Sequence, residues 1–322
     1  MLIMKITDQH AKYFAYELTK RCSSDSLEKL SSTLSNAQVD LNPHQIEAAL
    51  FAFRSPLSKG AILADEVGLG KTIEAGLVIS QKWAERKRKI LLIVPSSLRK
   101  QWNAELQEKF FLPSIILETK SFNEYIKKGN LNPFNQENTI VICSYHFARA
   151  KSPYIKQTKW DLVVIDEAHR LRNVYKSSNK IAREIKDALS EVPKILLTAT
   201  PLQNSLLELY GLVSIIDEHV FGDLTSFKVN YARLSREQDV YDSDAGLVEP
   251  RQEMFMDLRN RLQPVCIRTL RRQVLEYIKY TKRIPLTQDY IPTDQEVELY
   301  NGMSEYLQRP KLFALPNSQR QL

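Results

Sequence analysis

Short hydrophobic runs separated by helical patterns dominate the middle of the chain. The runs are apolar at nearly every position, which is typical of strands that helices cover on both faces. They lie at 61–64, 90–94, 114–117, 139–143, 162–165 and 194–197. The clearest helical patterns between them are 72–85, 98–110 and 179–189. We therefore expect an α/β domain with a parallel sheet and helices on both faces.

The two ends of the chain have a different pattern. The first 40 residues are polar and helix-like, and after Asp217 the strand-like runs stop and charged, helix-like sequence follows. We predict a helical N-terminal extension at 1–40, an α/β domain at 41–217 and a helical C-terminal extension at 218–322. The final residues, 315–322, lack the signals of a finished domain, so a truncated chain is one interpretation of this end.

Composition narrows the class of protein only slightly. The 322 residues include 45 Lys and Arg against 38 Asp and Glu, a net charge of +7 that suits a polyanionic partner without proving one. The three cysteines, Cys22, Cys143 and Cys266, are scattered and indicate a reducing compartment. No apolar run is long enough to cross a bilayer, and no signal peptide is recognisable. We expect a cytoplasmic protein without a membrane partner, associated with the nucleoid if the source is bacterial.

A phosphate-binding loop follows the first hydrophobic run. Glycines permit backbone angles that turn N–H groups inward, and a helix N-terminus adds its positive dipole end. We expect the nucleotide to be bound by Gly68, Leu69, Gly70, Lys71 and Thr72. Lys71 would reach the β- and γ-phosphates, and the Thr72 hydroxyl would bind Mg²⁺. Asp65 stands where the strict pattern has its first glycine, and a plain helix start is the alternative interpretation of Gly-Lys-Thr.

A pair of acidic residues follows the run at 162–165. Ligands of open α/β sheets bind at the carboxyl ends of the strands, where Asp166 and Glu167 lie. Asp166 would hold Mg²⁺, and Glu167 would polarise the water that attacks the γ-phosphate. A solvated strand end with incidental acids is the alternative. The two motifs together favour catalytic ATP binding by Lys71, Asp166 and Glu167.

These segments resemble known motifs. The sequence Asp166-Glu167-Ala168-His169 is similar to the DEAH box of superfamily 2 helicases, and residues 65–76 resemble the first motif of Swi/Snf-type DNA translocases, especially their bacterial RapA-like branch. That family tolerates Asp at the position of Asp65. The resemblance covers about residues 41–285 and implies a RecA-like lobe, a P-loop NTPase fold.

Further segments resemble the family's motifs in the same order. Each segment alone has an ordinary structural interpretation, such as a helix cap or a turn. The resemblance to the family therefore rests on their order along the chain. By resemblance, Gln45 would contact adenine, residues 94–102 and 142–145 would face DNA, 197–204 would couple ATP to nucleic acid, and 270–272 would belong to the helical extension. The implied nucleic-acid and coupling residues are Ser96, Gln101, Trp102, Ser144, Thr198, Thr200 and Gln203.

The resemblance implies an ATP- and Mg²⁺-dependent translocase on double-stranded DNA, with a DNA-bound protein such as RNA polymerase as its cargo. The family's motors hold ATP between two lobes, and the second lobe supplies arginine fingers. No second lobe is recognisable after Asp217, so we expect this chain alone to hydrolyse ATP feebly. A strand-separating DNA or RNA helicase and a regulatory ATP-binding module completed by a partner remain alternatives. A metabolic kinase would not explain residues 96–102 or 198–204.

Overall fold

The computed structural model describes residues 40–54, 59–235, 248–278 and 289–307, together with positions 9 and 12. The chain divides after Ile278 into two compact units, Met1–Ile278 and Lys279–Leu322. The predicted N-terminal helical extension and Cys22 therefore lie outside the described residues, apart from those isolated positions. Among the described helices, none is long and apolar enough to cross a membrane.

A seven-stranded parallel sheet forms the centre of the first unit. Its strand order is β3-β4-β2-β5-β6-β1-β7, and every described pairing is parallel. The strands are β1 Gly60–Leu63, β2 Ile90–Val94, β3 Ser114–Ile116, β4 Ile140–Ser144, β5 Leu162–Ile165, β6 Lys194–Leu197 and β7 Cys266–Ile267. All strands are parallel, so their carboxyl ends meet at one edge. The six predicted runs match the first six strands to within one residue at each end.

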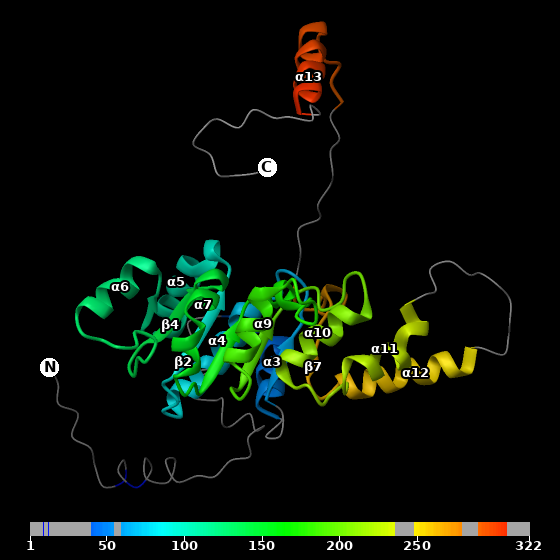
Figure 1. Cartoon of the computed structure of the whole chain (residues 1–322). Helices are drawn as coiled ribbons and strands as arrows, with labels where there is room; N and C mark the ends of the chain where they lie inside the picture. Colours follow the sequence, from blue (N-terminus) through cyan, green and yellow to red (C-terminus); the bar gives the residue numbers. More distant parts are fainter. Residues whose placement is uncertain are drawn as a thin grey trace. The chain divides into compact units, whose positions relative to one another are not determined.

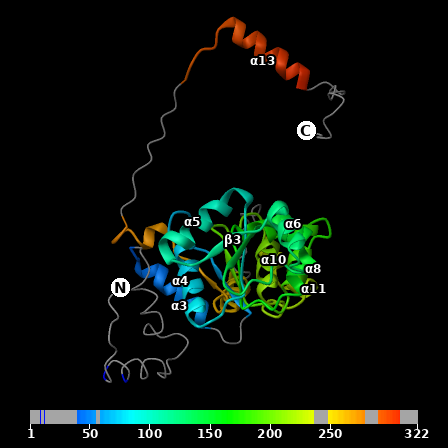
Figure 2. The same ribbon diagram turned by 90° about the vertical axis from the view of Figure 1, so that its left-hand side faces the viewer.

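Helices cover both faces of this sheet (Figures 1 and 2). The described helices of this unit are α3 Pro43–Arg54, α4 Lys71–Ala84, α5 Arg99–Phe110, α6 Thr119–Lys127, α7 Tyr145–Ala150, α8 Ser152–Lys156, α9 Lys180–Ala188, α10 Leu206–Ile216, α11 Leu224–Ser235 and α12 Val248–Leu262. Short 3₁₀ helices lie at Ser96–Leu98, Ala168–Leu171 and Arg271–Gln273. One hydrophobic cluster joins α3, α4 and α5 to the sheet, and a second contains residues of α7, α9 and α10.

The strand residues alternate between these two clusters. Ile62 and Leu91 belong to the cluster with α7, α9 and α10, whereas Leu63 and Leu92 belong to the cluster with α3, α4 and α5. Successive side chains of a strand point to opposite faces, so a strand that is covered on both sides needs apolar residues throughout. This packing explains the continuous hydrophobic runs and confirms the expected α/β fold.

The segment after Asp217 departs from the prediction of helices alone. Cys266 and Ile267 form β7, which pairs in parallel with Ile62 and Leu63 of β1 and adds a seventh strand at the edge of the sheet. Two residues are too short a run to give a strand pattern, so the sequence did not indicate it. The first compact unit accordingly continues to Ile278.

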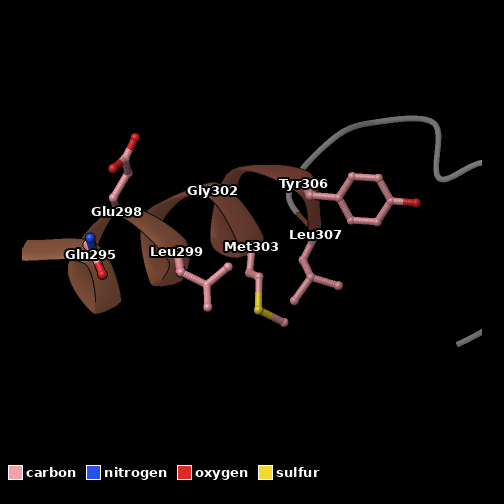
Figure 3. Close-up of a pocket in the computed structure, with 7 residues that line it drawn as sticks. All are labelled: Gln295, Glu298, Leu299, Gly302, Met303, Tyr306 and Leu307. Carbon is pink, nitrogen blue, oxygen red and sulfur yellow. The ribbon is translucent and has the colours of Figure 1, made fainter.

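The described part of the second unit contains helix α13, Asp294–Leu307. Leu299, Met303 and Leu307 are 65, 58 and 59% exposed and extend from the same side of the helix in Figure 3. They line a shallow hollow together with Gln295, Glu298, Gly302 and Tyr306. All seven residues belong to this one helix, so the hollow is one face of α13 and we assign no site to it.

Candidate functional site

The phosphate loop connects β1 to α4 at the carboxyl edge of the sheet. Gly68 and Gly70 have φ values of 85° and 94°, a region in which residues with a Cβ are strained. The Lys71 ammonium lies against the loop and donates to the carbonyl oxygens of Asp65 and Glu66 at 2.7 and 3.3 Å. The predicted strand, glycine loop and helix are therefore all present.

The start of α4 has free hydrogen-bond donors. Gly70 is the N-cap, and no side chain caps the helix. Among the described residues, the backbone N–H groups of Gly70, Lys71 and Thr72 donate to no acceptor. Unpaired N–H groups at a helix N-terminus, with the helix dipole behind them, attract phosphate oxygens. This arrangement fits a nucleotide phosphate, and the Thr72 hydroxyl at the same turn fits an Mg²⁺ ligand.

Helix α3 contacts the loop from one side. Gln45 donates through Nε2 to the carbonyl oxygen of Leu69 at 2.9 Å, and its Oε1 accepts from the N–H of Asn42 at 3.1 Å. A Cβ added to Gly70 would lie 2.3 Å from Gln45 Nε2. Gln45, Leu69 and Gly70 are therefore adjacent, as a nucleotide site requires. Gln45 is 5% exposed, and it acts here as a link between α3 and the loop.

The acidic pair lies two strands away, at the end of β5. Asp166 accepts from the N–H of Glu167 at 2.8 Å through Oδ1 and from the indole Nε1 of Trp102 at 2.8 Å through Oδ2. Burial raises the Asp166 pKa, and these two hydrogen bonds oppose the rise. The two donors thus help to keep a buried carboxylate ionised, which is the state that binds a metal ion.

Trp102 is therefore not available for the predicted contact with DNA. Its side chain is 2% exposed and lies in the core beside Leu106 and Phe110 of the same helix. The spacing of these three residues, four apart, is the signal of a buried helix face that the motif comparison overlooked. The burial of Trp102 argues against a direct contact with DNA, and its indole instead donates to Asp166.

Glu167 has a strained backbone. Its φ of 52° is in the left-handed region, which is uncommon for a residue with a Cβ and is frequent at functional sites. Its Oε2 lies 3.1 Å from Nδ1 of His169. Burial lowers the Lys71 pKa, and the charges of Glu74, Glu167, Asp65 and Asp166 oppose that change. Lys71 and both acids of the second motif therefore lie within one electrostatic environment.

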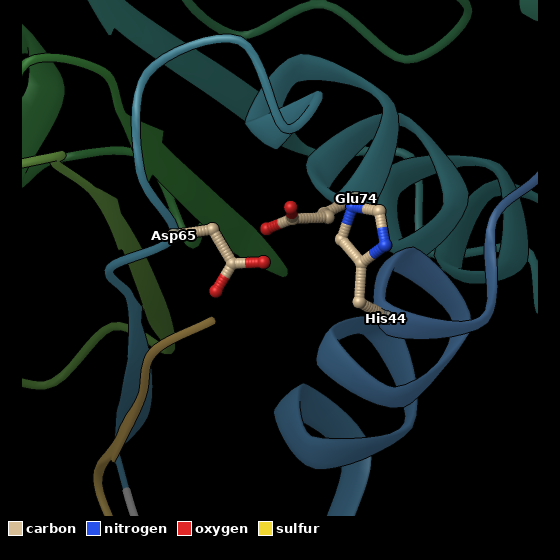
Figure 4. Close-up of side chains that lie close together, drawn as sticks. All are labelled: His44, Asp65 and Glu74. Atoms are coloured by element: carbon tan, nitrogen blue, oxygen red, sulfur yellow. The ribbon is translucent and has the colours of Figure 1, made fainter. Parts of the chain in front are cut away.

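Behind the phosphate loop, His44, Asp65 and Glu74 bring potential ligand atoms within 4.8 Å of one another (Figure 4). His44 Nε2 lies 2.8 Å from the Leu69 carbonyl oxygen, which can only accept, so this nitrogen carries a proton. Its Nδ1 lies 3.3 Å from the hydroxyl of Tyr277. Both ring nitrogens are engaged, so we interpret the cluster as a support for the loop and not as a metal site.

The two carboxyl groups of this cluster share a buried environment. Both side chains are 0% exposed, and the Glu74 carboxyl group hydrogen-bonds the Asp65 carboxylate. Burial and, secondarily, the charge of Asp65 raise the Glu74 pKa to about 9. Glu74 is therefore protonated at neutral pH. The motifs did not point to Glu74, although an acid within the apolar pattern of α4 is a visible signal in the sequence.

The predicted coupling segment follows β6, the strand between β1 and β5. Thr198 is completely buried, and its hydroxyl accepts from the N–H of Thr200 at 3.2 Å. Gln203 is exposed and accepts from the Arg172 guanidinium at 2.6 Å. Arg172 follows the acidic segment 166–169, so this hydrogen bond connects the chain just after that segment to the predicted coupling segment. Thr198 supports the turn, while Thr200 and Gln203 are exposed.

The remaining predicted residues gather near the ends of β2, β3 and β4. A groove of about 520 Å³ is lined by Arg99, Glu118, Thr119, Lys120, Ser144, His146, Phe147 and Ala150. Ser144 also caps α7 by accepting from the N–H of Phe147 at 3.3 Å. Ser96 is exposed and begins a 3₁₀ helix without a side-chain cap. Gln101 is exposed and bonds Glu105 on its own helix at 2.8 Å.

Comparison with known proteins identifies the family. The model of the SNF2-related domain matches residues 20–320. The chain belongs to the SNF2-related family. This membership agrees with the parallel sheet and with the ordered motifs along its carboxyl edge.

Two curated relatives of this SNF2-related chain illustrate its similarity. It is 34% identical over 236 residues to the uncharacterized ATP-dependent helicase YqhH of Bacillus subtilis, a match that covers 72% of this chain and 39% of YqhH. It is 34% identical over 201 residues to the RNA polymerase-associated protein RapA of Yersinia pseudotuberculosis, covering 61% of this chain and 20% of RapA. The chain thus spans between a fifth and two fifths of these relatives.

Solved structures confirm the fold. The SWI2/SNF2 ATPase core of Sulfolobus solfataricus in complex with dsDNA has a TM-score of 0.56 and 24% identity, covering 73% of this chain and 45% of that one. The ATPase core domain from the same organism has a TM-score of 0.57 and 23% identity, covering 78% and 47%. The RecA-like fold of an SNF2 ATPase core is therefore shared.

Proposed function

We propose that this chain is the ATP-binding lobe of an ATP-dependent double-stranded DNA translocase. The observation that carries the proposal is the position of the phosphate loop and the acidic pair at one edge of the sheet. Lys71 lies within the electrostatic influence of both Asp166 and Glu167. ATP hydrolysis requires a phosphate-binding loop, a metal-binding carboxylate and a group that orients water in this proximity.

Different residues of the lobe bind the phosphates, hold Mg²⁺ and orient the attacking water. The N–H groups at the start of α4 and the Lys71 ammonium bind the phosphates, and Gln45 borders the same site. Thr72 and Asp166 would hold Mg²⁺, which neutralises phosphate charge when bound. Glu167 accepts a hydrogen bond from the attacking water and orients it. Thr198, Thr200 and Gln203 connect this chemistry to the neighbouring strands.

The groove beside β2, β3 and β4 supports a nucleic-acid partner. Lys120 and Arg99 supply cationic groups along it, although Arg99 is paired with Glu118 of the same groove at 3.1 Å, and Ser96 offers a hydroxyl at an exposed helix start. Such groups contact backbone phosphates without selecting a base sequence. Duplex DNA is the substrate that we propose, because a structural neighbour was solved with dsDNA. A DNA-bound protein such as RNA polymerase is the proposed cargo, since RapA is named for its association with that enzyme.

The test is the ATPase rate of the complete gene product with no nucleic acid, blunt duplex DNA, single-stranded DNA or RNA. The Glu167→Gln variant serves as the blank. We expect strong stimulation by blunt duplex and a feeble rate from the isolated 1–322 chain. Stimulation by single strands or RNA alone would favour a helicase, and no stimulated activity would favour a regulatory module. A robust rate from the isolated chain, lost in Lys71→Ala, would contradict the expectation of feeble hydrolysis.

A matched pair of variants tests the groove. Lys120 and Lys127 both belong to α6, but only Lys120 lines the groove. Lys120→Glu should reduce DNA stimulation at moderate salt and make it less dependent on salt, because a phosphate contact releases counterions. Lys127→Glu makes the same change in net charge and should have a smaller effect. Equal effects would mean that overall charge, and not the groove, attracts the DNA.

A further inference from the structure

The chain that follows α12 lies alongside β1 and continues past it along the phosphate loop. We call the residues from Val265 to Tyr277 the exit segment, because they are the last part of the first compact unit before it ends at Ile278. Three backbone hydrogen bonds join the two stretches. They run from Ile62 N–H to the Val265 oxygen at 2.7 Å, from Ala64 N–H to the Ile267 oxygen at 2.8 Å and from Glu66 N–H to the Thr269 oxygen at 3.1 Å. The third reaches the loop itself.

The exit segment returns hydrogen bonds to the acids of the loop. The N–H of Thr269 donates to Oδ1 of Asp65 at 2.6 Å, and the N–H of Arg271 donates to Oε2 of Glu66 at 2.6 Å. Hydrogen bonds to a carboxylate are stronger than those between neutral groups. Burial raises the Asp65 pKa, and the bond from Thr269 opposes this. The loop is therefore held by backbone donors over several successive residues.

The Arg271 side chain controls one peptide unit of the loop. Its Nε and Nη2 donate to the carbonyl oxygen of Val67 at 3.0 and 2.6 Å. In a trans peptide the C=O and N–H groups point in opposite directions, so fixing the Val67 oxygen directs the N–H of Gly68 away from Arg271. Gly68 has a φ of 85° and can adopt several backbone conformations. Arg271 selects one of them.

The exit segment also contacts helix α3, which borders the phosphate loop. Tyr277 stacks on His44 with ring centroids 5.9 Å apart and an interplanar angle of 24°. His44 lies beside Gln45 in α3, and both side chains contact the Leu69 carbonyl oxygen. The exit segment thus supports the phosphate loop directly through Arg271 and supports α3 through Tyr277.

We propose that Arg271 is a positioning residue that holds the phosphate loop in its nucleotide-binding conformation, and that nucleotide binding is thermodynamically linked to the exit segment. The inference rests on the proposed ATP site, which it deepens. Linkage is reciprocal, so a segment that favours the binding conformation is itself stabilised when nucleotide binds. The bound state is thereby communicated to the point at which the chain leaves the first unit.

The first experiment measures binding of a fluorescent ATP analogue with Mg²⁺ to the 1–322 chain. Arg271→Ala should weaken binding about fivefold to tenfold, the effect of losing one or two hydrogen bonds that fix the loop. Arg272→Ala is the matched control, because Arg272 is exposed in the same 3₁₀ turn and should change binding less than twofold. Arg271→Lys keeps the charge without the paired donors. Full recovery by lysine would attribute the effect to charge and overturn the positioning role.

The second experiment measures amide hydrogen exchange and begins with the wild-type chain. Amide hydrogen exchange of Thr269 and Arg271, the donors to Asp65 and Glu66, should slow at least about threefold when nucleotide binds, because the loop is then held in one conformation. In the Arg271→Ala chain without nucleotide, exchange at Leu69, whose N–H donates to the Glu66 oxygen within the loop at 3.2 Å, should become faster. Unchanged exchange at Thr269 and Arg271 on nucleotide binding would overturn the linkage. A wild-type chain that binds no nucleotide would instead refute the proposed ATP site.

Discussion

Replacing Trp102 by phenylalanine tests whether a buried indole maintains the metal-binding state of Asp166. Trp102 Nε1 donates to Asp166 Oδ2 at 2.8 Å, in surroundings where Trp102 is 2% and Asp166 9% exposed. The phenyl ring fills most of the space of the indole but donates no hydrogen bond. Of the two described donors to this carboxylate, only the N–H of Glu167 would remain.

The size of the effect follows from the kind of bond that is lost. A hydrogen bond to a charged group contributes about 1.5–3 kcal/mol, and a buried acceptor that loses its donor retains the cost of desolvation. Burial already raises the Asp166 pKa, so the variant raises it further. Protons then compete with Mg²⁺ for Asp166, and the competition is stronger at low pH. We expect the Mg²⁺ concentration for half-maximal binding of an ATP analogue to rise by up to about tenfold, which corresponds to ~1.4 kcal/mol, and the rise to be larger near pH 6 than near pH 8.

The assay is a Mg²⁺ titration of fluorescent ATP-analogue binding at both pH values. Trp160→Phe is the matched control, because Trp160 is 6% exposed and its Nε1 donates at 2.9 Å to the backbone oxygen of Ile155, away from Asp166. That variant should lose stability without a change in Mg²⁺ dependence. An equal loss in both variants, or a Trp102→Phe effect of the same size at both pH values, would refute the proposed support of Asp166.

Three further predictions concern the loop and the buried charges. Gly70→Ala should weaken nucleotide binding at least about tenfold and cost about 1–3 kcal/mol of stability, because φ is 94° and the Cβ would meet Gln45; near-normal binding would contradict the geometry. Burial lowers the Lys194 pKa from 10.5 to about 8. Between about pH 8 and 10.5 the unfolded chain therefore binds more protons at this residue, so the Lys194 contribution to stability rises with pH. Lys194→Met should remove that rise and add about 1–3 kcal/mol of stability at neutral pH, measured by urea denaturation; a retained rise would exclude Lys194 as its source. The Glu74 pKa is raised from 4.5 to about 9, so between these pH values the folded chain binds more protons and stability falls as the pH rises. Glu74→Gln should flatten this fall in the thermal midpoint, and an unaltered pH profile would refute Glu74 as its source.

The sequence indicated the residues of the proposed nucleotide site but not the residues that support them. Lys71, Thr72, Asp166 and Glu167 each follow a hydrophobic run, and parallel strands bring the ends of such runs to one edge. The partners that hold these residues come from distant segments. The Arg271 hydrogen bonds to Val67 span 204 positions, and no local pattern encodes such a contact.

By itself, the sequence determined the class of fold and placed the residues of the proposed ATP site at the carboxyl edge, because strand periodicity and loop composition are local properties. It could not determine that Trp102 faces Asp166 instead of DNA, since the same residue suits a surface motif and a buried helix face. It did not reveal β7, because a two-residue strand exists only through pairing with β1. Burial decided the protonation of Glu74, and packing against the loop decided the position of Arg271. These properties depend on which distant groups exclude water and supply hydrogen bonds, and only the tertiary structure specifies those groups.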